Sequence, residues 1–203
     1  MTSNETKKKE RWKTREQKYI SEFTPRLQRD LRLFPTKEVQ KEQEGRYIDL
    51  LWEGMSLYIN GIVGCGKSLL AAKLLLKILE HSYFEIEHKI NSYLFINTSE
   101  MLELIKKGFD NKEQEDIIEK CKTVDLLILD DIGVEKVSDW TFQMFYLLIN
   151  YRYEHLIPII FTSNLTKEQL GKKLGDHRLV SRITAMSEDV KMRDIDWRIK
   201  NKK

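Results

Sequence analysis

The residues from 61 to 68 place the strongest constraint on how this chain folds. They read Gly-Ile-Val-Gly-Cys-Gly-Lys-Ser and match the phosphate-loop pattern G-x-x-x-x-G-K-[ST]. The apolar residues 56–60 before the loop predict a strand, and the leucine-rich residues 69–79 after it predict a helix. The pattern requires a strand, a loop and a helix in this order, so we expect the loop to join a buried strand to a helix.

Such a loop predicts a binding site for a nucleoside triphosphate, ATP, together with Mg²⁺. Glycines let backbone N–H groups turn toward phosphate oxygens, and the helix that follows adds the positive end of its dipole. We expect Lys67 to reach the outer phosphates and the Ser68 hydroxyl to join the Mg²⁺ shell. The expected nucleotide contacts are Gly61, Ile62, Val63, Gly64, Cys65, Gly66, Lys67, Ser68 and Leu69.

The composition is typical of one soluble domain with short extensions. The chain has 203 residues, of which 41% are hydrophobic and 33% charged. No apolar run approaches the roughly 18 residues of a membrane span, and no apolar stretch follows the basic N-terminus as in a secretory signal. Two cysteines provide neither a disulfide framework nor a four-ligand zinc site. We therefore expect a cytoplasmic protein without a membrane partner.

Positive charge is concentrated at the two ends of the chain. Residues 1–18 carry seven Lys/Arg against three Glu, and residues 191–203 carry six against two Asp, so each end has a net charge of +4. The overall charge is +3, so the residues between them are net acidic at −5. Basic ends favour an anionic partner, with nucleic acid first, although solvated termini explain the charge equally well.

The chain divides into three parts by pattern. We predict a polar N-terminal extension over 1–45, interrupted at Pro25 and Pro35, an ATPase domain over 46–190 and a basic tail over 191–203. Within the domain, further apolar strands at 92–97, 124–130 and 157–162 alternate with helical patterns, which indicates a parallel sheet covered by helices on both faces. The expected helices span 99–107, 112–122, 138–155 and 166–174.

An acidic pair, Asp130 and Asp131, ends one of these apolar strands. The carboxyl ends of parallel strands form the ligand-binding edge of such a sheet, so the pair should lie beside the phosphate loop. We assign Asp130 to the Mg²⁺ shell, partly through water, and Asp131 to orienting or deprotonating the attacking water. Asp is one methylene shorter than Glu, so we expect slow ATP hydrolysis. The alternative is a solvated acidic turn.

Asn164 follows the next apolar strand in the same way. Its amide is suited to hydrogen-bond both a γ-phosphate oxygen and the attacking water. The alternative is an Asn that begins a turn before the next helix.

Two arginines, Arg178 and Arg182, are spaced to share one face of a helix. Paired guanidinium groups suit a phosphate clamp or an arginine finger that enters a neighbour's active site, and we favour Arg182 for the finger. A surface ion pair with the nearby Asp176 is the alternative.

Together these motifs resemble the AAA+ ATPases of the DnaC/DnaI helicase-loader group and the related IstB transposition helpers. The resemblance covers about residues 47–190 and is most specific at 127–135 with 138–140, at 151–153 and at 162–165. It implies a three-layer P-loop core without a C-terminal lid, self-association through the ATP site, and these roles: Walker A for Lys67 and Ser68, Walker B for Asp130 and Asp131, sensor 1 for Asn164 and arginine finger for Arg182.

The resemblance also implies partners. The two short helices between 99 and 122 resemble an insertion that lines a path for single-stranded DNA, and a replicative DNA helicase is the partner of the loaders. The expected DNA contacts are Lys106, Lys107, Phe109 and Lys112, for which a solvated loop is the alternative. Aromatic and aliphatic residues of the N-terminal extension form either a partner-binding surface or a cluster packed on the domain: Trp12, Tyr19, Ile20 and Phe23.

The function expected from these residues is that of an ATP-dependent helicase loader whose hydrolysis is stimulated by DNA or by its partner. An IstB-like transposition helper and a nucleotide-switched adaptor with incidental hydrolysis remain alternatives. A small-molecule kinase would need an acceptor pocket and a basic lid, and the sequence shows neither. The compact size fits a phage or mobile-element version of the family.

Overall fold

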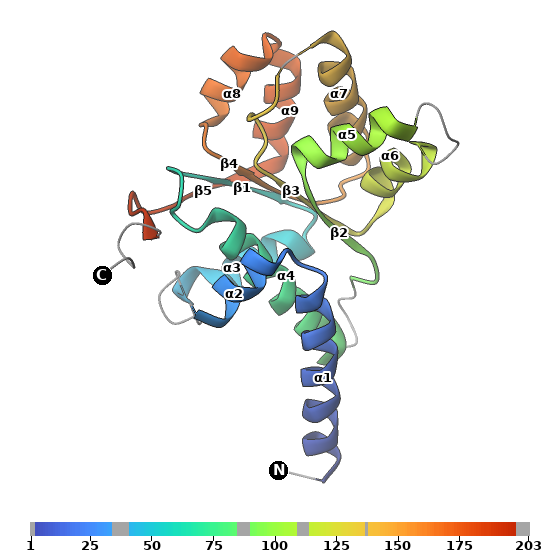
Figure 1. Cartoon of the computed structure of the whole chain (residues 1–203), viewed down its shortest axis with the longest axis vertical. Coiled ribbons are helices and arrows are strands. Elements are labelled where there is room, and N and C mark those ends of the chain that lie inside the picture. The colour runs from blue at the N-terminus through green and yellow to red at the C-terminus, as the bar shows by residue number, and fades with distance from the viewer. Residues whose placement is uncertain (1–2, 34–40, 85–89, 109–113, 137, 198–203) are drawn as a thin grey trace.

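The structure, a computed structural model, describes residues 3–33, 41–84, 90–108, 114–136 and 138–197. A single sheet lies between two groups of helices, and the first helix projects away from the body (Figure 1).

The sheet has five strands in the order β2-β3-β4-β1-β5, and every neighbouring pair is parallel. Its strands are β1 (Ser56–Asn60), β2 (Tyr93–Asn97), β3 (Leu126–Asp130), β4 (Ile159–Ser163) and β5 (Ser187–Lys191). Because all the strands run the same way, their carboxyl ends meet at one edge. Asn60 pairs with Ser163 there, and Asn97 pairs with Asp130.

Side chains alternate between the two faces of the sheet, as the pleat requires. In β1, Leu57 and Ile59 join one hydrophobic cluster while Tyr58 joins the other. In β3, Ile128 and Leu129 divide in the same way. Both faces are buried, which explains why these strands read as continuous apolar runs and confirms the predicted parallel sheet with helices on both faces.

One face is covered by helices from the first part of the chain (Figure 1): α1 (Ser3–Ser21), α2 (Pro25–Leu33), α3 (Lys41–Trp52) and α4 (Lys67–Phe84). Trp12 and Phe23 are buried in the same cluster as α4, and Tyr19 and Ile20 pack against it. Of the two expectations for these four side chains, the packed cluster is the one that the structure shows. Helix α3 continues through residue 45, where the sequence suggested a boundary.

The other face is covered by α5 (Thr98–Gly108), α6 (Gln114–Thr123), α7 (Asp139–Glu154), α8 (Lys167–Leu174) and α9 (His177–Met186). Ser138 caps α7 by accepting a hydrogen bond from the backbone N–H of Thr141. Thr166 and Gln169 form a capping box at the start of α8, the helix expected from residue 166. The two short helices expected between the second and third strands are present as α5 and α6.

Strand β5 was missed by the sequence pattern. It is an edge strand that, among the residues described, pairs with β1 alone. It reads Ser-Glu-Asp-Val-Lys, so it lacks the apolar run of the inner strands. Only Ser187 and Val190 are buried, and the pairing with β1 supplies the backbone hydrogen bonds that define the strand.

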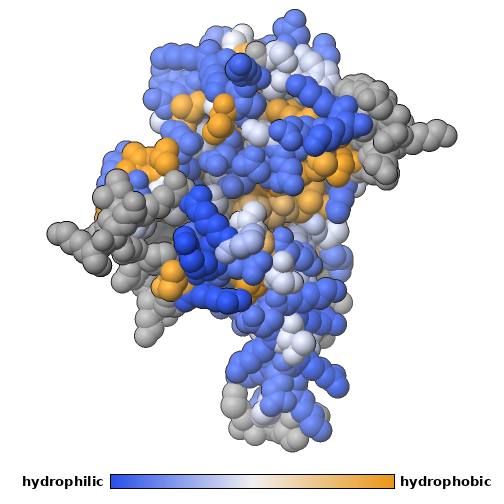
Figure 2. Space-filling model, viewed as in Figure 1, coloured by the Kyte–Doolittle hydropathy of each residue, from blue (hydrophilic) through white to orange (hydrophobic). Residues whose placement is uncertain are grey.

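The surface seen in Figure 2 is hydrophilic over most of the projecting α1, and the hydrophobic residues gather in smaller patches on the body. Within the described segments, no helix combines the length and the apolar character that crossing a membrane would require.

Candidate functional site

The loop between β1 and α4 has the backbone geometry of a phosphate cradle. Gly64 and Gly66 have φ angles of 81° and 94°, in the left-handed region that glycine tolerates without strain. Helix α4 begins at Lys67, so the N–H groups of its first turn face the loop. Consecutive N–H groups at a helix N-terminus form a site that favours phosphate.

Lys67 lies inside this cradle, with only 6% of its surface exposed. Its ammonium group donates hydrogen bonds to the Gly61 carbonyl at 3.1 Å, the Ile62 carbonyl at 3.0 Å and the side-chain oxygen of Asn164 at 2.6 Å. The structure therefore brings together two predicted site residues, one at the start of α4 and the other just after β4.

The Asp130 carboxylate is the centre of a second set of contacts. One oxygen accepts a hydrogen bond from Ser68 Oγ at 3.1 Å, and the other accepts one from Thr162 Oγ1 at 2.6 Å. Thr98 Oγ1 donates to the Asp130 backbone carbonyl at 2.8 Å. The pairing of Ser68 with Asp130 joins the phosphate loop to the acidic strand end.

Burial raises the pKa of Asp130 above its ordinary value, and the neighbouring Asp131 raises it further. The hydrogen bonds from Thr162 and Ser68, together with the charge of Lys67, oppose the shift without cancelling it. A buried carboxylate next to a hydroxyl is a donor set that fits Mg²⁺. Within the described residues, no group of three or more His, Cys, Asp or Glu that could hold a metal ion is present.

Asp131 adopts a left-handed backbone conformation with a φ of 59°. Such a conformation costs about 1–3 kcal/mol for a non-glycine residue, and the hydrogen bond from its N–H to Thr162 Oγ1 at 2.9 Å helps to hold it. Among the described residues, the Asp131 carboxylate accepts no hydrogen bond, so it is available to a water molecule.

Thr98 and Thr162 were not singled out by the sequence. Both lie at strand ends on the same edge as Asp130, and Thr162 supports both acidic residues. Polar residues at strand ends were the signal that could have identified them.

The segment after β5 also lies against the loop, although the sequence suggested only a basic tail. Met192 N–H donates to the Asn60 carbonyl at 2.8 Å, and Trp197 N–H donates to the Gly64 carbonyl at 3.1 Å. A Cβ added to Gly64 would lie 2.1 Å from Asp196 Oδ1, so the Asp196 side chain would have to shift, and the φ of 81° at this position favours glycine. Cys65 is buried in the same place, and burial raises the pKa of its thiol.

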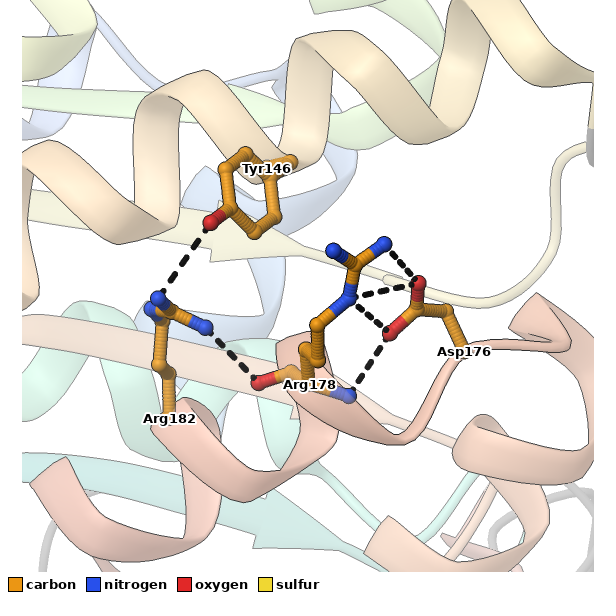
Figure 3. Close-up of polar contacts among 4 residues, drawn as sticks. All are labelled: Tyr146, Asp176, Arg178 and Arg182. Atoms are coloured by element: carbon orange, nitrogen blue, oxygen red, sulfur yellow. Dashed lines mark hydrogen bonds and ion pairs between the residues drawn. The ribbon is translucent and has the colours of Figure 1, made fainter.

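In the part of the chain that the structure describes, Arg182 does not contact the residues around the phosphate loop. Figure 3 shows its guanidinium between α9 and α7, beside the Tyr146 hydroxyl and the Arg178 carbonyl. Its Nε also donates to Asn150 Oδ1 at 2.7 Å. Arg178 instead pairs with Asp176 at 2.8 Å and its side chain is 71% exposed, so the ion-pair alternative describes Arg178 but not Arg182.

Two of the three lysines expected to contact DNA, Lys106 and Lys107, lie on α5. Lys106 Nζ lies 4.9 Å from the centroid of the Trp140 ring, and Lys107 lies 3.9 Å from Glu103. The other two expected contacts, Phe109 and Lys112, lie outside the described residues.

A parallel sheet lies between two helical layers, with a phosphate loop after β1 and acidic and amide groups at the ends of β3 and β4. These features define a P-loop nucleotide-binding core of the AAA+ class. A family model described as IstB-like ATP binding protein matches residues 11–203. The chain therefore belongs to the IstB-like ATP-binding family, which confirms the family that the motifs indicated.

Individual relatives agree with this placement. The chain is 25% identical over 119 residues to the replicative helicase loader DnaI of Bacillus subtilis strain 168, covering 58% of this chain and 36% of that protein. It is 27% identical over 147 residues to an IS21 putative ATP-binding protein of Pseudomonas aeruginosa, covering 70% and 52%. The crystal structure of the DnaC helicase loader matches with a TM-score of 0.68 at 26% identity, covering 84% of this chain and 100% of that one. The chain thus matches only about a third to a half of the length of these two curated relatives.

Proposed function

We propose that this protein is an ATP-dependent helicase loader that binds ATP with Mg²⁺ and single-stranded DNA, and that it hydrolyses ATP at interfaces between copies of itself. The proposal rests on two hydrogen bonds, one from Lys67 to Asn164 and the other from Ser68 to Asp130. These contacts join the phosphate loop to two neighbouring strand ends, which is the arrangement that binding and hydrolysis of a triphosphate need.

In the proposed site, the loop amides and Lys67 bind the β- and γ-phosphates. Lys67 then exchanges the carbonyls of Gly61 and Ile62 and the Asn164 oxygen for phosphate oxygens. Asn164, once released from Lys67, is able to hydrogen-bond the γ-phosphate or the attacking water. Ser68 and Asp130 would hold Mg²⁺, which supplies positive charge to the phosphates.

Hydrolysis in this scheme begins with a water molecule that the Asp131 carboxylate orients. The water oxygen bonds to the γ-phosphorus, the bond from that phosphorus to the β–γ bridging oxygen breaks, and ADP leaves with the electron pair. The proton of the water passes to Asp131 or to the phosphate product. Lys67 stabilises the negative charge that develops on the departing oxygen.

Arg182 is proposed to complete the site of an adjacent copy. Its contacts in the described structure are with α7 and with its own helix, and none is with the phosphate loop. An arginine held apart from its own loop is suited to act in trans. Sharing of this kind predicts an ATPase rate per molecule that rises with protein concentration.

The proposed partners are a replicative helicase and single-stranded DNA. The support is family membership together with the similarity to DnaI and to the DnaC loader structure. Lys106 and Lys107 are proposed phosphate contacts on α5. The similarity to the IS21 protein favours a second candidate, a transposition helper that recruits a transposase.

Affinity capture from the host cell tests the partner directly. The tagged protein is used as bait with and without a non-hydrolysable ATP analogue, and the Lys67→Ala variant is the matched control. Nucleotide-dependent recovery of a replicative helicase would support the loader, and a transposase in its place would support the second candidate. Recovery of neither from cells that contain both would contradict the loader proposal.

Two variants separate a loader ATPase from a nucleotide-switched adaptor. Lys67→Ala should abolish nucleotide binding, whereas Asp131→Asn should retain binding and lose hydrolysis. If the Asp131→Asn variant still supports helicase loading at the wild-type rate, hydrolysis is incidental and the adaptor explains the function better.

A further inference from the structure

We propose that Asn150 and Tyr146 on α7 are positioning residues that orient the Arg182 guanidinium toward the ATP site of an adjacent copy. This inference rests on the shared-site function proposed above and deepens it.

Each nitrogen of the guanidinium has one partner in the described structure. Nε donates to Asn150 Oδ1 at 2.7 Å, one terminal nitrogen donates to the Tyr146 hydroxyl at 3.3 Å, and the other donates to the Arg178 carbonyl at 3.3 Å. The guanidinium carbon also lies 5.0 Å from the centroid of the Tyr146 ring (Figure 3). One N–H on each terminal nitrogen remains for a phosphate oxygen, because a guanidinium carries five N–H donors.

The partners of Arg182 are neutral. An amide oxygen, a phenol and a backbone carbonyl hold the group without cancelling its charge, so the full positive charge is retained for a phosphate. Arg178 offers the opposite case. Asp176 binds it through both carboxylate oxygens, at 3.2 and 3.3 Å from Nε, which neutralises its charge. Because its partners are neutral, Arg182 rather than Arg178 is the arginine whose charge remains available to bind an anion.

The two helices that supply these groups are fixed against each other. Tyr146 and Asn150 are four residues apart on α7, as Arg178 and Arg182 are on α9, so each pair lies on one face of its helix. Phe145 of α7 belongs to the same buried cluster as α9 residues such as Leu179 and Ile183. A rigid α7–α9 pair therefore reduces the rotamer entropy that Arg182 would lose on binding.

Steady-state ATPase kinetics test the assignment. Asn150→Ala should lower kcat by about 10- to 100-fold while the KM for ATP changes by less than about threefold, because misplacement of the arginine affects the reacting complex rather than nucleotide binding. Tyr146→Leu should lower kcat in the same way, and Tyr146→Phe, which keeps the ring, should have a smaller effect. Asp176→Asn, which keeps the α9 cap and releases Arg178, is the matched control and should retain the wild-type rate.

Asn150→Asp separates orientation from simple helix packing. A carboxylate would strengthen the link between α7 and α9 but would neutralise Arg182, so positioning predicts a slower enzyme of undiminished thermal stability. If Asn150 only joins the helices, this variant should hydrolyse ATP at the wild-type rate.

Subunit mixing provides a readout that a local structural role would not change. Asn150→Ala subunits mixed with Lys67→Ala subunits should regain activity, because the intact arginine of one faces the intact loop of the other. No recovery would mean that Asn150 serves the loop of its own chain, which would overturn the inference.

Separate results would contradict the shared-site function and the positioning role. A wild-type rate for Arg182→Ala would overturn the shared-site function itself. A slow Arg182→Ala together with wild-type rates for Asn150→Ala and Tyr146→Leu would leave the shared site standing and overturn the positioning role. Circular dichroism of each variant confirms that the comparison is made between folded proteins.

Discussion

The ammonium group of Lys67 lies 2.6 Å from the side-chain oxygen of Asn164, and this contact joins the phosphate loop to the end of β4. A phosphate must compete with the Asn164 oxygen for the same ammonium group. We therefore expect nucleotide binding to replace the contact between Lys67 and Asn164.

Changing Asn164 should affect binding and hydrolysis in different directions. Asn164→Ala removes the competing oxygen, so ATP should bind at least as tightly as in the wild type while kcat falls by about 10- to 100-fold. Asn164→Asp would hold Lys67 more strongly and repel the phosphates, weakening ATP binding by about tenfold or more. Calorimetry with a non-hydrolysable analogue measures both affinities. Equal affinities for the two variants would contradict a competition between phosphate and the residue-164 side chain for Lys67.

Thr162 is expected to support the site through its hydroxyl group. Thr162→Val removes the donor to Asp130 and the acceptor for the Asp131 N–H, so the free energy of unfolding should fall by about 1–3 kcal/mol. Hydrolysis should slow as well, because both acidic residues lose their support. Thr162→Ser keeps the hydroxyl and should remain close to wild type in urea denaturation and in activity. Equal effects of the Val and Ser substitutions would contradict the role assigned to the hydroxyl group.

The pKa of Asp130 predicts a pH-dependent effect on stability. The pKa is raised in the folded state, so the native protein binds this proton more tightly than the unfolded chain. The resulting contribution to stability is fully present below the ordinary Asp pKa of 3.8 and is lost as the pH rises through the native value. The Asp130→Asn side chain cannot ionise, so the variant should not lose this stability as the pH rises.

Thermal unfolding with EDTA and without nucleotide measures the effect. The Tm of Asp130→Asn should exceed that of the wild type at neutral pH, and the advantage should shrink on acidification toward about pH 4. A Tm difference that does not depend on pH would contradict the assigned cause.

Arg152 should be essential for stability and unimportant for nucleotide affinity. It is fully buried and donates to four backbone carbonyls, whose donor–acceptor distances lie between 2.6 and 3.1 Å: Cys121, Lys122, Val124 and Pro158. Burial lowers its pKa to about 10, which still leaves it charged at neutral pH. Arg152→Met should reduce the free energy of unfolding by about 3–5 kcal/mol, because the carbonyls lose their donor.

These carbonyls lie around the amino ends of β3 and β4, at the opposite edge of the sheet from the phosphate loop. The folded fraction of Arg152→Met should therefore bind ATP with wild-type affinity. Denaturant unfolding and calorimetry on the same preparation check both expectations, and weakened binding by the folded protein would show that the two edges are coupled.

Much of the site could be predicted because each of its parts follows a buried strand. The loop, the acidic pair and Asn164 all end apolar runs, and parallel strands bring such ends to one edge. The helix starts expected near residues 138 and 166 are also confirmed, because a helix start depends on capping by a few neighbouring residues.

The remaining features depend on contacts between distant residues. Strand β5 has a polar sequence and exists through its pairing with β1. Asp196 approaches Gly64 only because the chain turns back after β5, and Asn150 meets Arg182 only because α7 and α9 pack together. The DNA contacts and the division of the chain at residues 45 and 190 stay predictions.

The central claim, that one copy of the chain completes the ATP site of another, is tested most directly by mixing two inactive variants. Lys67→Ala lacks a working loop but keeps Arg182, and Arg182→Ala has the reverse defect. The account predicts that each alone is nearly inactive and that an equal mixture recovers about a quarter of the wild-type rate, the share of interfaces that pair an intact loop with an intact arginine. A mixture no more active than the sum of its parts would contradict the shared site.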